Sequence, residues 1–143
     1  MNTSKHLVEG AISPGFIEEE IARHNVRMCV GANMVFLGRV RADEVNGTTV
    51  TGIEYSAYDE MIDPCIEEIR EQLFREHDDL VYLHVRHSKG LVKCDEISLF
   101  VMVSTGHRHQ AFRALEDCVE LIKAKLPVWK KEYLSDGNAR WIG

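Results

Sequence analysis

The sequence of 143 residues lacks an excess of basic residues, a long apolar run and any closely spaced cysteine pair. It has 17 Lys and Arg against 23 Asp and Glu, a formal net charge of −6, whereas a general nucleic-acid or membrane-surface binder needs a broad cationic face. A membrane span needs about 18 consecutive apolar residues, and a signal peptide needs an apolar core near the N-terminus. The chain has neither, which predicts a cytoplasmic protein whose anion sites are local.

Cysteine spacing and glycine spacing exclude further classes. The protein contains no Cys-x-x-Cys motif, so a zinc knuckle and a dithiol redox centre lose their usual support. We expect reduced thiols that pack as small apolar side chains, and a nucleophilic Cys94 or Cys118 stays open as the weaker alternative. No Walker or dinucleotide glycine loop occurs either, which argues against nucleotide hydrolysis and hydride transfer.

What is present is the composition of a soluble globular protein, with 45% hydrophobic and 28% charged residues. The length suits one domain spanning residues 1–143. Hydrophobic periodicity predicts helices at 13–26, 59–78 and 107–126, and strands at 29–41, 47–58, 80–85, 96–105 and 128–134, with a short edge segment at 139–143.

The order of these elements predicts an α+β fold in which a single mixed or antiparallel sheet carries helices largely on one side. We expect residues 29–41 and 47–58 to form a hairpin around the polar turn between them. Residues 96–105 are apolar on both faces, which predicts a central strand.

Two segments carry arginines that suit an anionic ligand. Arg39 and Arg41 are two residues apart, so both would project from one face of a strand, where their planar guanidiniums match a phosphate. His107 and Arg108 stand at an expected helix start, where unpaired amides favour anions. Helical geometry predicts an inward-pointing Arg108 whose anionic partner is a ligand or a structural carboxylate such as Glu54.

The histidines admit several roles. His107 suits an acid or base near neutral pH, a donor to phosphate, or a helix cap. The pairs His84/His87 and His107/His109 suggest a metal, but neither pair has a third ligand adjacent in the sequence. We therefore expect no metal site.

The segment Lys123–Glu132, KAKLPVWKKE, gathers four lysines in ten residues of an acidic chain. Lys123 is expected near the helix end, and the Pro-Val-Trp corner can fold Lys130 back toward it. A lysine that is partly desolvated or close to other cations has a lowered pKa and becomes a usable base or nucleophile. The alternative is that such lysines cover apolar surface and complement the helix C-terminus.

These residues resemble the large, catalytic subunit of molybdopterin synthase, the MoaE family. The resemblance runs from MVFLGRVR at 34–41 to ARWIG at 139–143 and includes GIEYSAYDEM, CDEISLFVMVSTGHRHQAF and LIKAKLPVWKKE. Its most specific part is Lys-x-x-x-Pro-x-Trp-Lys-Lys-Glu with an upstream His-Arg. Where relatives usually have His-Arg-x-Gly, residues 86–90 read RHSKG, so we assign no pocket role to that segment.

The resemblance implies an α/β hammerhead-type fold and a homodimer that takes a small ubiquitin-like subunit at each end, giving a heterotetramer. It implies a sulfurtransferase in molybdenum cofactor biosynthesis. The thiocarboxylated Gly-Gly tail of the small subunit gives sulfur to cyclic pyranopterin monophosphate, and two transfers form the dithiolene of molybdopterin. Neither a metal nor another cofactor is implied.

The resemblance also implies residue roles. Lys123 and Lys130 match the two catalytic lysines. The implied substrate-binding positions, which include both lysines, are Arg39, Val40, Arg41, His107, Arg108, Lys123, Lys130, Lys131 and Glu132. Two alternatives from other classes remain: a non-catalytic module that binds an acidic peptide tail or phosphorylated ligand, and, ranked last, a hydrolase that uses His107 as its base.

Overall fold

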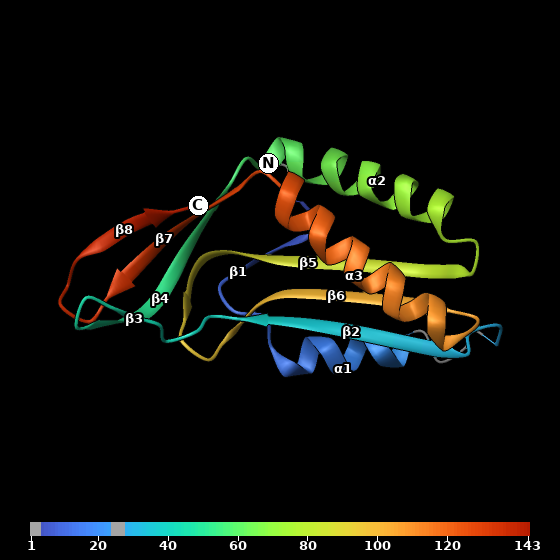
Figure 1. Cartoon of the computed structure of the whole chain (residues 1–143), viewed down its shortest axis with the longest axis horizontal. Coiled ribbons are helices and arrows are strands. Elements are labelled where there is room, and N and C mark those ends of the chain that lie inside the picture. The colour runs from blue at the N-terminus through green and yellow to red at the C-terminus, as the bar shows by residue number, and fades with distance from the viewer. Residues whose placement is uncertain (1–3, 24–27) are drawn as a thin grey trace.

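The computed structural model describes residues 4–23 and 28–143. Three helices and eight strands alternate along the described chain (Figure 1). They are β1 (Leu7–Glu9), α1 (Pro14–Arg23), β2 (Ala32–Arg39), β3 (Glu44–Val45), β4 (Thr48–Ala57), α2 (Asp59–Glu76), β5 (Leu80–Lys93), β6 (Ile97–Thr105), α3 (Arg108–Lys125), β7 (Val128–Leu134) and β8 (Ala139–Ile142). The α+β class is confirmed.

The strands form one sheet in the order β2-β6-β5-β4-β7-β8. All pairings along this path are antiparallel, while β1 adds a short parallel pairing to β5. All nine residues of β6 are buried, which confirms the predicted central strand. A strand without polar alternation is stable there because both of its faces are covered.

The expected hairpin between residues 29–41 and 47–58 is wrong. β2 pairs with β6, whereas β4 pairs with β5 and β7, so the two segments lie on different parts of the sheet. The local hairpin is instead the two-residue β3 with the start of β4. Its turn contains Asn46 and Gly47 at φ of 49° and 82°, the conformation that a tight Asn-Gly turn requires.

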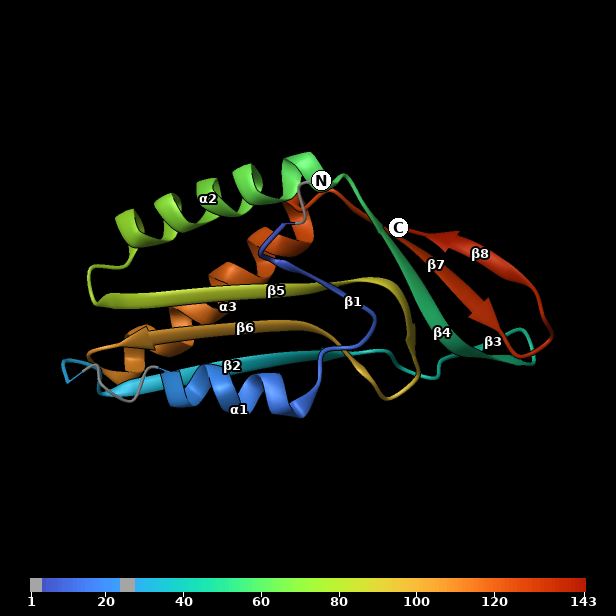
Figure 2. The same cartoon turned by 180° about the vertical axis from the view of Figure 1, so that it is seen from behind.

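Helices cover both faces of the β2-β6-β5 region. α2 and α3 pack on one face around a core that includes Ile66, Ile69 and Val101. α1 lies on the opposite face, where Phe16 packs with Phe100 (Figures 1 and 2). The sequence prediction that helices lie largely on one side therefore holds for two of the three described helices.

The remaining strands, β3, β4, β7 and β8, extend beyond the helices, and we call them the arm (Figure 1). The long strand β5 connects the two parts, since it pairs with β6 up to His87 and with β4 from Gly90. Gly90 has a φ of 90°, a left-handed conformation that glycine adopts without steric cost, at the point where β5 passes from one partner to the other.

A side-chain cap marks the start of α1. The Ser13 hydroxyl accepts a hydrogen bond from the Phe16 amide at 3.1 Å and so caps α1 ahead of Pro14. The last three residues of the helix predicted at 13–26, residues 24–26, lie outside the described residues. Within the described ranges, no helix combines the length and apolar character that crossing a bilayer requires.

Candidate active site

A cleft of about 270 Å³ opens where the helix-covered part meets the arm. The end of β2, β4, β6, the last turns of α3, and β7 all contribute to it. A smaller cavity of about 100 Å³ shares His87, Leu99, Lys123 and Lys130 with the cleft. The cleft is lined by Gly38, Arg39, Arg41, Asp43, Ile53, Tyr55, His87, Ser98, Leu99, Lys123, Lys130, Glu132 and Ile142.

Lys123 and Lys130 face this cleft from two elements joined by the Pro127 corner. Lys123 stands on the last turns of α3 and is exposed, whereas Lys130 is a partly buried residue of β7. Burial lowers the pKa of Lys130, and the charge of Lys123 lowers it further, against a raising effect of Glu132. The sequence expectation that the two amines lie at one end of the sheet is met, and a cation-rich setting favours the neutral amine.

Arg39 and Arg41 also line the cleft, although not as two members of one strand. β2 ends at Arg39, where a register irregularity interrupts its pairing with β6. Arg39 Nη1 donates to the Asp95 carbonyl oxygen at 2.7 Å. Arg41 lies beyond the strand and binds Asp43 through Nε at 2.5 Å and Nη2 at 3.2 Å. Asp43 therefore occupies part of the guanidinium fork.

Of the three remaining candidates, Val40, Lys131 and Glu132, only Glu132 lines the cleft. The Val40 side chain is 2% exposed, packs with Val50 and is not part of the cleft lining. The Lys131 ammonium lies 5.7 Å from the centre of the Trp141 ring and also stays outside the lining. Glu132 does line the cleft, is 7% exposed, and accepts a hydrogen bond from Arg140 Nε at 2.8 Å.

His107 and Arg108 lie at the opposite end of α3 from Lys123. Fifteen residues of helix separate Arg108 from Lys123, which is roughly 22 Å at 1.5 Å per residue. Both residues are exposed, and the His107 amide donates to Asp79 Oδ2 at 2.7 Å. Within one chain these two candidates do not reach the lysines.

The predicted inward direction of Arg108 is wrong. The buried face of α3 consists of Ala111, Ala114, Cys118, Val119 and Ile122, while Phe112 in the first turns is 55% exposed. Small residues let α3 approach the sheet closely at its start, so the long side chains there point to solvent. Glu54, offered as a structural partner for Arg108, accepts a hydrogen bond from the Tyr133 hydroxyl at 2.7 Å instead.

His87 is a cleft residue to which the sequence analysis assigned no role. It is 7% exposed, its ring packs edge-on against Tyr55 at 5.1 Å, and Nδ1 lies 2.7 Å from the Ser88 carbonyl oxygen. Burial lowers its pKa to about 4. Nδ1 therefore carries the proton that it donates to Ser88, and the ring is neutral near pH 7. The one sequence signal for His87 was its spacing to Gly90, which matches the His and Gly of the His-Arg-x-Gly segment of relatives.

The cleft has no metal character. Among residues 4–23 and 28–143, no three His, Cys, Asp or Glu side chains are grouped as ligands. Burial raises the pKa of Cys118 to about 12 and raises that of Cys94, which makes both poor nucleophiles at neutral pH. The fold and the cleft thus define a class: a small α+β protein in which lysine and arginine side chains from several elements line one cleft.

The particular family follows from comparison with known proteins. The MoaE protein family matches residues 9–125. The molybdopterin synthase catalytic subunit of Thermoplasma volcanium is 32% identical over 141 residues, covering 99% of this chain and 98% of the relative. That of Aspergillus fumigatus is 34% identical over 118 residues, and the match covers 82% of this chain and 62% of that longer protein. The chain belongs to the MoaE family.

Solved structures agree. Molybdopterin synthase from Staphylococcus aureus superimposes with a TM-score of 0.84 at 28% identity, covering 96% of each chain. A chain from the complex of subunits 1 and 2 of the Helicobacter pylori molybdopterin-converting factor gives 0.77 at 21% identity, covering 94% of this chain and 87% of that one. The second likeness, at its lower identity, concerns the fold alone.

Proposed function

We propose that this protein is the catalytic subunit of a molybdopterin synthase. In this reaction, sulfur passes from the thiocarboxylated C-terminus of a small ubiquitin-like subunit to cyclic pyranopterin monophosphate, and two transfers form the dithiolene of molybdopterin. The observation that carries the proposal is the convergence of Lys123 and Lys130 with Arg39 and Arg41 on one cleft. The family membership and the names of the curated relatives support it.

The charges of the cleft suit this chemistry. The substrate phosphate, the thiocarboxylate and the oxyanions that develop during transfer are all negative, and fixed cations stabilise such charge most where water is excluded. Lys130 is the better base, because its lowered pKa increases the fraction of neutral amine near pH 7. Lys123, at the exposed mouth, is positioned to meet the incoming peptide tail and to hold its carboxyl end.

His107 and Arg108 serve the same reaction from a second copy of the chain. β2 is an edge strand that pairs only with β6 among the described residues, and its free edge runs from Ala32, opposite Thr105, to Arg39. If two copies meet antiparallel along this edge, the His107 end of one copy lies beside the Arg39 end of the other. In a homodimer built this way, Arg108 of one copy lies near the cleft of the other, although α3 separates Arg108 from Lys123 within one chain.

The assembly that follows is a heterotetramer, in which each cleft of the homodimer takes one small subunit through its Gly-Gly tail. The Helicobacter pylori complex, which contains a chain of this fold, is consistent with such pairing. We expect the assembly in the cytoplasm, where the four cysteines, all free thiols in the structure, would remain reduced.

The direct test is reconstitution from purified components. The protein is mixed with a thiocarboxylated small subunit and cyclic pyranopterin monophosphate, and the dithiolene product is measured by mass spectrometry. Product in amounts proportional to the thiocarboxylate supplied is the expected result. Formation of the protein complex without product would instead identify a non-catalytic binding module.

A further inference from the structure

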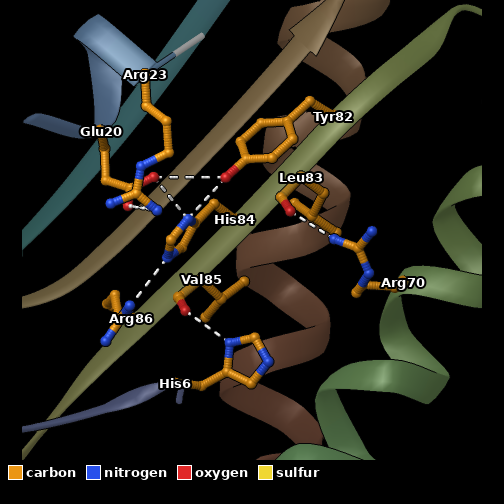
Figure 3. Close-up of polar contacts among 9 residues, drawn as sticks. All are labelled: His6, Glu20, Arg23, Arg70, Tyr82, Leu83, His84, Val85 and Arg86. Atoms are coloured by element: carbon orange, nitrogen blue, oxygen red, sulfur yellow. Dashed lines mark hydrogen bonds and ion pairs between the residues drawn. The ribbon is translucent and has the colours of Figure 1, made fainter.

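A second cavity, larger than the active cleft, lies away from that cleft at the edge of β5. It has a volume of about 400 Å³, within the range of small-molecule sites. It is bounded by the segment before β1, the end of α1, α2 and the first half of β5 (Figure 3). Its lining residues are Lys5, His6, Arg23, Glu67, Arg70, Tyr82, Leu83, His84 and Arg86.

This cavity exists because β5 has an open edge there. From Leu80 to Arg86, β5 pairs with β6 on one side only. A strand partner on the other side begins at His87, which lies opposite Leu7 of β1. Side chains satisfy the exposed carbonyls in place of a strand. Arg70 Nη1 donates to the Leu83 oxygen at 2.5 Å, and His6 Nδ1 lies 3.0 Å from the Val85 oxygen (Figure 3).

The cavity is cationic in a protein of net negative charge. Among the described lining residues, four cationic side chains stand against one carboxylate, Glu67, an excess of three positive charges. Glu67 lies 3.9 Å from Arg70 Nε, and the buried Glu20 behind the wall lies 3.3 Å from Arg23 Nη1. Even with Glu20 counted, an excess of two positive charges remains. Like charges gathered in this way repel one another unless an anion lies between them.

Arg86 is held in place for such an anion. Its Nε donates to His84 Nε2 at 3.1 Å, and its guanidinium lies 5.0 Å from the centre of the Phe16 ring. His84 is neutral, because burial lowers its pKa to about 4, and its Nδ1 lies 2.9 Å from Glu20 Oε2. The contacts from Arg86 to His84 and from His84 to Glu20 therefore hold the guanidinium through its Nε only (Figure 3).

Donors are left over after these contacts. Among the described residues, the two terminal nitrogens of Arg86 and the Lys5 ammonium have no hydrogen-bond or ion-pair partner. His6 adds no donor, because its Nδ1 carries the proton that it donates to the Val85 oxygen and Nε2 of the neutral ring is an acceptor. A planar guanidinium with both terminal nitrogens available binds two oxygens of one phosphate group.

We propose that this cavity is a second anion site that binds a small phosphorylated dianion, of phosphate ester or pyrophosphate type. Arg86 supplies the bidentate contact, the exposed Lys5 and Arg23 supply positive charge at the rim, and Arg70 closes the α2 side. The site is distinct from the active cleft because successive residues of a strand face opposite ways: Arg86 faces the α1 side and His87 faces the cleft.

Nuclear magnetic resonance of the histidine rings tests the proposal. The full-length protein, labelled with ¹³C and ¹⁵N, is titrated with inorganic pyrophosphate or phosphate at constant ionic strength, with sodium chloride and sulfate as comparison salts. His6 and His84 report on the cavity, and His87 reports on the cleft. We expect saturable shifts of the His6 and His84 signals with pyrophosphate that chloride does not produce.

Variants locate the binding. Arg86→Gln should weaken pyrophosphate binding, read at His6, by about tenfold or more, since it removes a charge-assisted bidentate contact. Arg75→Gln is the matched control: this exposed arginine lies on α2 and outside the cavity lining. Should Arg86→Gln fail to fold by circular dichroism, Arg23→Gln, whose side chain is 64% exposed, replaces it with an expected loss of severalfold.

Three results would overturn the proposal. Shifts that grow linearly with pyrophosphate, or that equal amounts of sulfate and chloride reproduce, would mean an adventitious ion only. Saturation seen only at His87 would place the anion in the active cleft. Equal affinity in the Arg75→Gln variant and in the cavity variants would show that these arginines hold no ligand. None of these results contradicts the proposed sulfur transfer, which the reconstitution assay tests separately.

Discussion

The helix-covered part and the arm differ in what they contribute. The first buries the main core between helices and sheet, with Ile62, Leu73 and Val101 fully enclosed. The arm has strands without helices and carries exposed aromatic residues such as Trp129 and Trp141. The cleft takes residues from both: Lys123 in the last turns of α3 and Arg39 at the end of β2 belong to the first part, and Lys130 belongs to the arm. Substitutions in the core should therefore affect mainly the stability of the fold, and substitutions in the cleft mainly the reaction.

The largest expected effect is a loss of catalytic rate in a variant that still folds. Lys130→Ala should lower the rate of molybdopterin formation a hundredfold or more, because it removes the half-buried amine that serves as base. Lys125→Ala is the control, since Lys125 is an exposed lysine in the last turn of α3 and does not line the cleft. A rate within a factor of a few of wild type for Lys130→Ala would remove Lys130 from the mechanism.

The second prediction concerns stability. Ile66→Ala, in the core beneath α2, should lower the free energy of unfolding by about 3 kcal/mol, because it leaves a cavity in a closely packed interior. Trp141→Ala in the arm, where the side chain is 62% exposed, should cost less than about 1 kcal/mol. Urea unfolding measures both. Equal losses of unfolding free energy in the two variants would show that the arm contributes to stability as much as the core does.

The third prediction uses the buried histidine between the two parts. The pKa of His87 is about 4 in the folded protein, against 6.5 for an unperturbed histidine, so the unfolded chain binds more protons between these values. Stability is therefore fully present above pH 6.5 and falls as the pH decreases toward 4. Between pH 7 and pH 4.5, wild type should lose about 2 kcal/mol more than His87→Gln.

That difference isolates His87, because the other acid-sensitive groups are common to both proteins. Urea unfolding at a series of pH values supplies the two curves. If the two proteins lost stability in parallel, His87 would titrate in the folded state much as it does in water, and the buried neutral ring would be contradicted.

The smallest effect concerns substrate affinity. Asp43 binds the Arg41 guanidinium and lines the cleft, so it competes with an anionic substrate. Asp43→Asn should lower the KM for cyclic pyranopterin monophosphate about two- to threefold, because an exposed ion pair is worth only a fraction of a kcal/mol. A raised KM would show that Asp43 positions Arg41 for the substrate.

The sequence predicted local features well. Periodicity located the helices and the central strand, and the Pro-Val-Trp corner at Pro127 indicated correctly that Lys123 and Lys130 lie together. These features depend on residues close in the chain. The family resemblance, borne out by the family match, then supplied a function that no single residue pattern specifies.

Long-range pairing was not predictable in the same way. β4 pairs with β7, placing Tyr55 opposite Lys130, and the sequence contains no local signal for that register. The false hairpin between β2 and β4 followed from assuming that neighbouring strands pair. His87 was missed for the same reason, because its place in the cleft depends on β5 passing from β6 to β4.

We propose that each active site combines Lys130 of one copy with Arg108 of another. Complementation is the decisive experiment: Lys130→Ala and Arg108→Ala proteins, each inactive alone, are unfolded together, refolded together and assayed for molybdopterin formation. Random pairing gives hybrid dimers in which one of two sites has both residues, so we predict recovery of about a quarter of the wild-type rate. No recovery above the separate variants, with hybrid dimers confirmed by mass spectrometry, would contradict the account.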